Sequence, residues 1–396
     1  EGRAPFYEPD LDPTIRKHVE AGRLRFSTDM TDVADADVHF VCVGTPQRRD
    51  GLAADLTYLD AAMDSLASVL QRPCLVVGKA TVPVGTADRL AARLAEIAPL
   101  GDSAELAWNP EFLREGHALE DTLHPDRLVF GVQSEGAEVA LRAVYAPVIA
   151  NDVPVVVTDL PTAELVKASA NAFLATKISF INAMAEICEV TGADVTKLAE
   201  ALGYDERIGR RFLDAGLGFG GGCLPKDIRA FIARAGEIGA GQSLAFLAEA
   251  DAVNLRRRER VAEIARELVG GDVAGKRVGV LGAAFKPNSD DVRDSPALTV
   301  AGQLHLHGAT VTVHDPKAMD NARRIFPTLT YADSAIDACR DADVVLHLTE
   351  WPEFREIDPA VLGDVVRMRN VVDGRNCLDA DAWRAAGWTY RGLGHS

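Results

Sequence analysis

The four residues Asp-Ala-Asp-Val occur twice in this chain, at 35–38 and at 341–344, and a short apolar run follows each copy. A helical pattern precedes both copies, so each one marks a step from helix to buried strand. Other apolar runs of strand length alternate with helical patterns, at residues 75–77, 128–130, 153–157, 276–282 and 310–315. Strands that alternate with helices are typical of parallel sheets. We therefore expect an α/β fold with two doubly wound, Rossmann-like domains.

A different pattern separates these two domains. Residues 162–189 are rich in Ala, Leu, Ile and Phe and contain neither Gly nor Pro, which predicts a long buried helix. Helical character continues to Leu202 and resumes, after a glycine-rich loop, until about Val269. The arginine-rich run 256–260 is expected to be a solvated helix face. We expect three parts, which are an N-terminal domain at 1–157, a central helical domain at 158–270 and a C-terminal domain at 271–396.

The composition restricts the class of partner and the compartment. With 396 residues and a net charge of −17, the chain is not expected to bind nucleic acid, although local basic groups can bind an anion inside an acidic protein. No apolar run approaches the length that spans a membrane, and no signal peptide is visible. The six cysteines are scattered without a CxxC pair, so we expect a reducing, cytoplasmic compartment.

The segment 218–227 reads Gly-Phe-Gly-Gly-Gly-Cys-Leu-Pro-Lys-Asp. Glycines let a ligand approach the backbone closely, and Pro225 suits the first turn of a helix. A cysteine at a helix start beside a lysine is expected to have a lowered pKa, which makes Cys223 a candidate nucleophile. The alternative is a loop around a buried structural cysteine. Lys226 and Asp227, directly behind the cysteine, favour chemistry.

Two pairs of polar residues are spaced four apart, which places both members of a pair on one helix face. Lys167 and Asn171 lie in the apolar helix predicted at 162–189, so they either take part in the chemistry or form a surface stripe. Glu111 and Glu115 follow Asn-Pro. They are predicted either to form a carboxylate pair with separated pKa values or to stabilise a helix start through its dipole.

Two charged loops follow the first strand of the C-terminal domain and contain Lys286 and Arg293. Positive groups over the carboxyl end of a strand suit phosphate recognition. The alternative is that both loops are merely solvated. His305 and His307 are two positions apart on an expected helix and point different ways, so we predict no metal site.

Together these residues resemble the UDP-glucose/GDP-mannose dehydrogenase family over nearly the whole chain. The resemblance rests on the order and spacing of the segments 7–9, 43–46, 81–85, 109–116, 167–171, 218–227, 284–295 and 373–375. It implies oxidation of the C6 alcohol of UDP-glucose to UDP-glucuronate in two hydride transfers, with two NAD reduced. GDP-mannose and UDP-N-acetylmannosamine stay open as substrates. A hydroxyacid dehydrogenase and a sugar-nucleotide-binding protein without turnover also stay open.

The same resemblance implies roles for individual residues, with a thiohemiacetal and then a thioester on the cysteine. The implied catalytic set is Cys223 as nucleophile, Lys167 and Asn171 as oxyanion donors, Asp227 as general base through a water that Thr81 orients, and Glu111 near that water. The implied substrate contacts are Glu115, Arg207, Phe219, Gly220, Lys226, Lys286 and Arg375. The implied NAD contacts are Val43, Gly44, Thr45, Thr81, Glu115 and Arg293. Arg207 would reach the site of a partner subunit, which implies a homodimer through the central helices.

The beginning of the chain departs from the family. Glu1 is not methionine, and residues 1–13 are predicted to be a loop, where an α/β domain normally begins with a strand. The family's first strand, its glycine-rich pyrophosphate loop and the acid that holds the ribose are expected to precede Glu1. We therefore expect this chain to bind NAD poorly, because the helix N-terminus that holds the pyrophosphate belongs to that segment.

Overall fold

The structure, a computed structural model, describes residues 2–99 and 101–395. The chain forms two compact units, Glu1–Ala172 with Lys226–Ala245, and Phe173–Pro225 with Phe246–Ser396. Two helices, α7 (Leu160–Thr191) and α9 (Leu224–Glu237), contribute residues to both units. The three-part division predicted from the sequence therefore stays a prediction.

The first unit contains a five-stranded sheet in the order β1-β2-β3-β4-β5. Its strands are β1 (Val38–Val41), β2 (Cys74–Gly78), β3 (Ala104–Trp108), β4 (Leu128–Gly131) and β5 (Val155–Thr158). Strands β1 to β3 are parallel, whereas β4 pairs antiparallel with β3. The expectation of a purely parallel sheet is wrong at this pair. The chain after β3 runs as a loop to residue 117 and contains only the short helix α4 (Ala118–Leu123), so it re-enters the sheet from the edge at which β3 ended.

Both faces of this sheet are covered, which explains the continuous apolar runs seen in its strands. Val76 packs in a core with α2 (Thr57–Ala67) and α3 (Thr86–Ile97), while its neighbours Leu75 and Val77 pack on the opposite face with α5 (Glu135–Val144). Successive side chains of a strand point to opposite faces, so a two-sided core needs apolar residues at every position. The remaining helices of the unit are α1 (Leu11–Glu20), α6 (Ala146–Ile149), η1 (Met30–Val33), η2 (Gly101–Ser103) and η3 (Gly241–Leu244).

Helix α1 corrects one expectation, because it begins at Leu11 inside the segment predicted to be a loop. None of its residues is buried. Pro13 lies in its first turn, where proline is tolerated, so the prolines of this segment do not exclude a helix.

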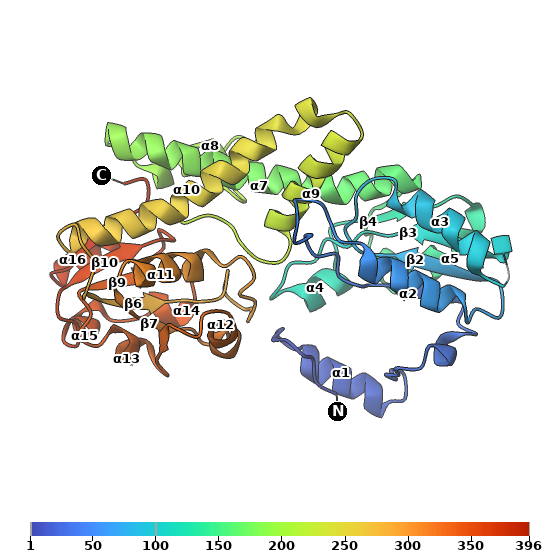
Figure 1. Cartoon of the computed structure of the whole chain (residues 1–396), viewed down its shortest axis with the longest axis horizontal. Helices are drawn as coiled ribbons and strands as arrows, with labels where there is room; N and C mark the ends of the chain where they lie inside the picture. The colour runs from blue at the N-terminus through green and yellow to red at the C-terminus, as the bar shows by residue number, and fades with distance from the viewer. Residues whose placement is uncertain (1, 100, 396) are drawn as a thin grey trace. The chain divides into compact units, whose positions relative to one another are not determined.

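The second unit contains a six-stranded, wholly parallel sheet in the order β11-β10-β9-β6-β7-β8. Its strands are β6 (Arg277–Leu281), β7 (Thr310–His314), β8 (Thr330–Tyr331), β9 (Val344–His347), β10 (Asn370–Asp373) and β11 (Thr389–Gly392). The strand order reverses between β6 and β9, as in doubly wound folds, so the predicted C-terminal fold is confirmed. Figure 1 shows α11 on one side of these strands and α13 on the other. The helices are α11 (Pro296–Leu306), α12 (Met319–Ile325), α13 (Ala335–Cys339), α14 (Pro352–Arg355), α15 (Pro359–Gly363) and α16 (Ala380–Ala385).

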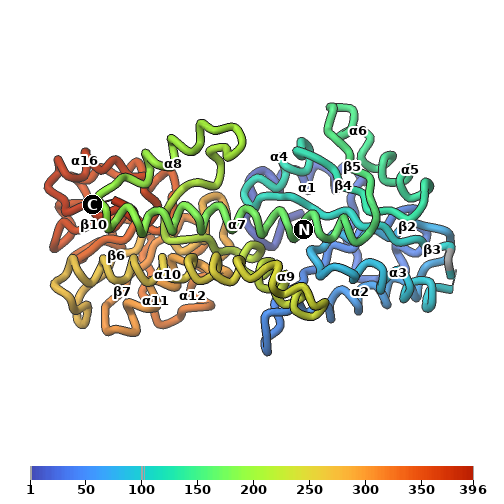
Figure 2. The backbone as a smooth tube through the Cα atoms, turned by 90° about the horizontal axis from the view of Figure 1, so that it is seen from above, coloured from blue at the N-terminus to red at the C-terminus, as the bar shows by residue number. Residues whose placement is uncertain are grey.

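The predicted helical middle is also confirmed, and it includes α8 (Val195–Gly203) and α10 (Ala245–Leu268). Helix α10 runs beside the later part of α7, where Ser179 Oγ donates to the Ala250 carbonyl, 2.7 Å away (Figure 2). Within the described residues, every helix is too short or too polar to cross a bilayer.

The expectation that residues 256–260 form a solvated face is wrong. The side chain of Arg256 is 49% exposed, but those of Arg257 and Arg258 are 1% and 3% exposed. Each buried guanidinium meets a carboxylate from another segment, which is the condition under which a charge can be buried. Arg257 pairs with Glu189 at 2.7 Å, and Arg258 pairs with Asp294 at 2.7 Å.

Gly78 at the end of β2 is expected to be irreplaceable. A Cβ atom there would lie 2.0 Å from the ring of Trp108, which is 1% exposed and has no room to move. We predict that Gly78→Ala destabilises the protein by about 1–3 kcal/mol through overpacking, measured by urea denaturation. Gly136→Ala is the matched control, because a Cβ in α5 meets only Ser134 Oγ, at 3.6 Å. It should stabilise by about 0.5–1 kcal/mol. Equal effects of the two variants would contradict the packing argument.

Candidate active site

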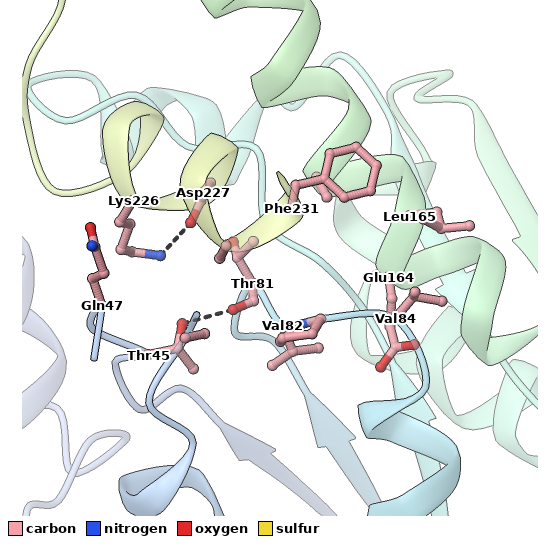
Figure 3. A pocket seen from close by; sticks show the side chains of 14 residues that line it. Thr45, Gln47, Thr81, Val82, Val84, Glu164, Leu165, Lys226, Asp227 and Phe231 are labelled. Carbon is pink, nitrogen blue, oxygen red and sulfur yellow. Dashed lines mark hydrogen bonds and ion pairs between the residues drawn. The ribbon is translucent and has the colours of Figure 1, made fainter. Parts of the chain in front are cut away.

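The loops that follow β1 and β2 meet at the carboxyl edge of the first sheet. Thr45 Oγ1 donates a hydrogen bond to the carbonyl oxygen of Thr81, 2.7 Å away. These residues, together with Lys226 and Asp227 of α9, line a cavity of about 20 Å³. Figure 3 shows the lysine and the aspartate extending from α9 toward the two threonine loops. That volume has room for about one water molecule, and Lys226 and Asp227 are polar members of a lining that is otherwise largely apolar.

Helix α7 brings Lys167 and Asn171 to one face, where both are buried, so the surface-stripe alternative is excluded. Lys167 Nζ lies 3.1 Å from Glu111 Oε1. Asn171 Nδ2 donates to Asp227 Oδ2 at 2.6 Å. The structure thus brings together four residues predicted for the catalytic set. A buried ammonium and a buried amide each need a partner, and here both partners are carboxylates.

Asp227 is the point at which α7, α9 and the cavity meet. Its side chain is 3% exposed and lies between the amine of Lys226, which contacts Oδ1, and the amide of Asn171, which contacts Oδ2. The arrangement places the side chain of Asp227 next to a space for one water, which is the geometry that a general base acting through water requires.

The two glutamates after Asn-Pro do not lie at a helix start, because α4 begins only at Ala118. Glu111 pairs with Lys167, and its Oε2 accepts a hydrogen bond from the backbone N–H of Leu113 at 2.6 Å. Glu115 is half-buried in the turn before α4. The carboxyl group that meets the beginning of α4 is instead Glu8, which accepts from the N–H groups of residues 116 and 118, both at 2.7 Å.

One residue at this site was missed by the sequence analysis. Glu164, which lies three positions before Lys167 on α7, is 2% exposed. Its two oxygens accept hydrogen bonds from the backbone N–H groups of Gly85 and Ala87, at 2.7 and 2.6 Å. It thereby ties the helix that carries Lys167 to the start of α3, just beyond the Thr81 loop. The available signal was an acid in a largely apolar stretch, three positions before Lys167.

In the second unit, Cys223 is exposed and directly precedes α9, whose first turn contains Pro225 as predicted. The glycines before it lie against a neighbouring loop. A Cβ on Gly220 would lie 2.3 Å from the Asp294 carbonyl oxygen, and one on Gly222 would lie 2.2 Å from the guanidinium carbon of Arg293. Backbone packed this closely on another segment tolerates only glycine.

The predicted phosphate-binding residues border the same loop. Lys286 Nζ lies 5.4 Å from the ring centroid of Phe285, a residue that itself faces Gly221. Arg293 Nη2 pairs with Asp291 at 2.8 Å, and the arginine side chain is 64% exposed. An exposed arginine and a neighbouring lysine can meet an anionic ligand here.

Arg375, after β10, makes contacts that hold loops together. Its Nε donates to the Leu348 carbonyl and its Nη2 to the Phe285 carbonyl, both at 2.9 Å, and Nη1 donates to the Gly218 carbonyl at 3.3 Å. The side chain of Arg207 is 88% exposed and pairs with Asp205 at 2.6 Å.

Possible ligand-holding groups fall into two kinds. Of the residues predicted for NAD, Val43, Gly44, Thr45 and Thr81 lie at the carboxyl edge of parallel strands, which is where α/β sheets bind ligands, whereas Glu115 lies in the turn before α4 and Arg293 in the second unit. Within residues 2–99 and 101–395, one group has metal-ligand spacing, namely His347, Asp373 and Cys377. Its carboxylate already accepts from His347, Tyr390 and the backbone N–H groups of residues 375, 377 and 378. It is thus fully used as a structural acceptor.

Comparisons with known proteins give a consistent result. Residues 1–149, 161–256 and 279–380 match the NAD binding, central and UDP binding domains of the UDP-glucose/GDP-mannose dehydrogenase family. The chain is 42% identical to UDP-glucose 6-dehydrogenase of Rhizobium meliloti, over 99% of this chain and 90% of the relative. The Bacillus subtilis UDP-glucose 6-dehydrogenase is 38% identical, over 99% and 88%.

Two solved structures are similar over the whole chain. A UDP-glucose dehydrogenase from Pyrobaculum islandicum has a TM-score of 0.91 at 39% identity and covers 100% of this chain and 88% of its own. A UDP-D-ManNAc dehydrogenase from Pyrococcus horikoshii has a TM-score of 0.86 at 26% identity and covers 100% and 90%.

Glu164 is expected to make stability depend on pH. Burial raises the pKa of Glu164 from 4.5 to about 7, against the opposing effect of the two N–H groups. A raised pKa in the folded state means that the folded protein binds the proton more tightly, so stability is lost as the pH rises from about 4.5 to 7. We predict a loss on the order of 1–3 kcal/mol over this window, measured from urea midpoints, and a flatter profile for Glu164→Gln. An unchanged slope in the variant would contradict this origin.

Proposed function

The chain belongs to the UDP-glucose/GDP-mannose dehydrogenase family, and from that premise we propose that it is an NAD-dependent dehydrogenase that oxidises UDP-glucose to UDP-glucuronate. The relatives named UDP-glucose 6-dehydrogenase are about 40% identical over nearly the full chain. The UDP-D-ManNAc enzyme is 26% identical, against 39% for the UDP-glucose enzyme of known structure, so the alternative sugar substrate is not favoured. A sugar-nucleotide-binding protein without turnover is not favoured either.

The observation that carries the proposed mechanism is the buried group Lys167, Asn171 and Asp227 beside a cavity for one water. NAD, when bound, accepts one hydride at each of two oxidations. Between them, the thiolate of Cys223 adds to the aldehyde carbon and forms a thiohemiacetal. Loss of the second hydride leaves a thioester, which water converts into carboxylate and free thiol. Overall, one alcohol, two NAD⁺ and one water give one carboxylate, two NADH and three protons.

The polar residues of the first unit supply what these steps require. Lys167 uses one N–H for Glu111, and Asn171 uses one N–H for Asp227, so each keeps donor capacity for an oxyanion. Asp227 is the acceptor for the proton of the attacking water, which the Thr81 loop helps to orient. Cys223 precedes Asp227 by four positions, at the start of the same helix.

The second unit is proposed to hold the UDP part of the substrate. Lys286 follows Phe285, whose ring faces Gly221 of the cysteine loop, and is proposed to meet the UDP phosphates, whereas the exposed Arg293, which lies against Gly222, is proposed to meet the cofactor. Arg375 is proposed to act beside Lys286, because it fixes both the 285 loop and the Gly218 carbonyl.

We also propose a homodimer formed through the central helices. Phe173, Phe180 and Ile187 recur every seven positions along α7 and are 66%, 49% and 54% exposed, and Val190 is 87% exposed. A second copy of this stripe would cover these side chains. Because Cys223 must stay reduced to act as a nucleophile, a cytoplasmic location is part of this proposal.

Removing the nucleophile should separate the two oxidations. Cys223→Ser is predicted to form at most one NADH for each UDP-glucose, because an aldehyde without its thiol adduct does not readily lose hydride, whereas the unaltered protein forms two. Absorbance at the NADH band with a limiting amount of each sugar nucleotide measures this ratio and also ranks UDP-glucose against GDP-mannose.

The control for that experiment is Cys74→Ser, which makes the same substitution at the amino end of β2 and should keep the ratio of two. If Cys223→Ser also forms two NADH at a normal rate, the assigned nucleophile is wrong.

A charge in the apolar stripe should prevent pairing of subunits. Phe180→Glu is predicted to give a particle of 42.4 kDa by light scattering, while the unaltered protein has about twice that mass. Val139→Glu places the same charge at a 60% exposed position on α5 and should not change the mass. An unaltered protein that is itself monomeric at micromolar concentration would refute the homodimer.

A further inference from the structure

Two buried polar side chains of α10 form hydrogen bonds with the backbone of the loop that leads to Cys223. Asn254 Oδ1 accepts from the Phe219 N–H at 2.7 Å, and its Nδ2 donates to the Phe219 carbonyl at 3.0 Å. One turn later, Arg258 Nη2 donates to the same carbonyl at 2.9 Å. Asn254 is 0% and Arg258 3% exposed, so these are buried polar contacts.

A second nitrogen of the Arg258 guanidinium binds the segment on the far side of the loop. Its Nη1 contacts Asp294 Oδ1 at 2.7 Å and Thr299 Oγ1 at 3.2 Å. The glycine loop is also bound directly to that segment, because the Gly221 N–H donates to the Arg293 carbonyl at 2.9 Å. On its other side the loop packs tightly on α10, since a Cβ on Gly218 would lie 2.3 Å from Asn254 Oδ1. The loop is therefore held from both sides.

We propose that Asn254 and Arg258 are positioning residues that fix the main chain before Cys223 and so set the reactivity of its thiol. Three glycines separate Phe219 from Cys223, and glycine gives the backbone more freedom than any other residue. A nucleophile at the end of such a segment reaches a defined position only if the segment is anchored. This inference rests on the proposed role of Cys223 as the nucleophile.

The arrangement of α10 supplies an internal comparison. Arg257 and Arg258 are adjacent, equally buried and each paired with a carboxylate, but only Arg258 contacts the cysteine loop. Arg257 pairs with Glu189, whose Oε1 also accepts from the Gly394 N–H. Loss of a buried guanidinium is expected to lower stability at both positions, whereas a change in the reactivity of the Cys223 thiol is expected only at position 258.

The test compares Arg258→Lys and Asn254→Asp with Arg257→Lys in the full chain. Alkylation of Cys223 by iodoacetamide is followed by peptide mass spectrometry from pH 5 to 9, together with kcat and KM for UDP-glucose. We expect the first two variants to shift the pH midpoint of alkylation and to lower kcat about 10–100-fold, because small misplacements of a reacting group are costly. KM should change less than kcat. Arg257→Lys should lower the thermal midpoint and keep the alkylation profile of the unaltered protein.

A profile like that of the unaltered protein in Arg258→Lys and Asn254→Asp, or equal effects at positions 257 and 258, would overturn the proposal. If neither variant folds, Thr299→Val tests the proposal instead, because it removes one contact of Arg258. It should shift the pH profile of Cys223 alkylation in the same direction by a smaller amount. Failure of the proposed function is seen separately, as two NADH per sugar from Cys223→Ser, and does not depend on these alkylation profiles.

Discussion

Buried polar side chains on α7 need hydrogen-bond or ion-pair partners, and the arrangement of the first unit depends on this need. Lys167 and Asn171 are buried, and an unpaired ammonium or amide in that position would cost several kcal/mol. The partners come from the loop after β3, as Glu111, and from α9, as Asp227. Glu164, one turn earlier, accepts hydrogen bonds from the backbone at the start of α3. One helix therefore collects three separate segments, and its polar residues place the groups that the chemistry uses.

In the second unit, close packing and hydrogen bonding of the backbone fix the position of the cysteine loop. The cysteine loop has glycine where a neighbouring atom lies within about 3 Å of a hypothetical Cβ, and its N–H and carbonyl groups are met by side chains of α10 and by the 293 carbonyl. Because glycine has no side chain, the loop can pack directly against α10 and the segment around residue 293. The hydrogen bonds to its backbone then restrict a segment that glycine would otherwise leave flexible. The two units therefore position their functional groups differently. Buried side chains position Lys167, Asn171 and Asp227, and a hydrogen-bonded backbone positions Cys223.

The sequence predicted those parts whose signal is local. Spacing of four residues placed Lys167 and Asn171 on one face, apolar runs predicted most strands, and the absence of Gly and Pro predicted α7. Strand β3, with the sequence Ala-Glu-Leu-Ala-Trp, lacks β-branched residues and was missed, and with it the antiparallel pair β3–β4. Two buried arginines were taken for a solvated face because their carboxylate partners lie 36 and 68 positions away. Burial of a charge depends on such distant partners, which a local pattern does not contain.

The overall charge of −17 does not conflict with an anionic substrate, because carboxylates near the site are already paired. Glu111 and Asp294 neutralise buried cations, and such pairs resist disruption since removing one partner leaves an uncompensated buried charge. The Arg293–Asp291 pair differs, because its guanidinium is 64% exposed and an exposed pair contributes only about 0–1 kcal/mol. An anionic ligand that binds Arg293, as proposed above, would therefore replace Asp291 at little cost and gain charge-assisted bonds. Burial thus separates Arg257 and Arg258, which hold segments of the second unit in place, from the exposed Arg293.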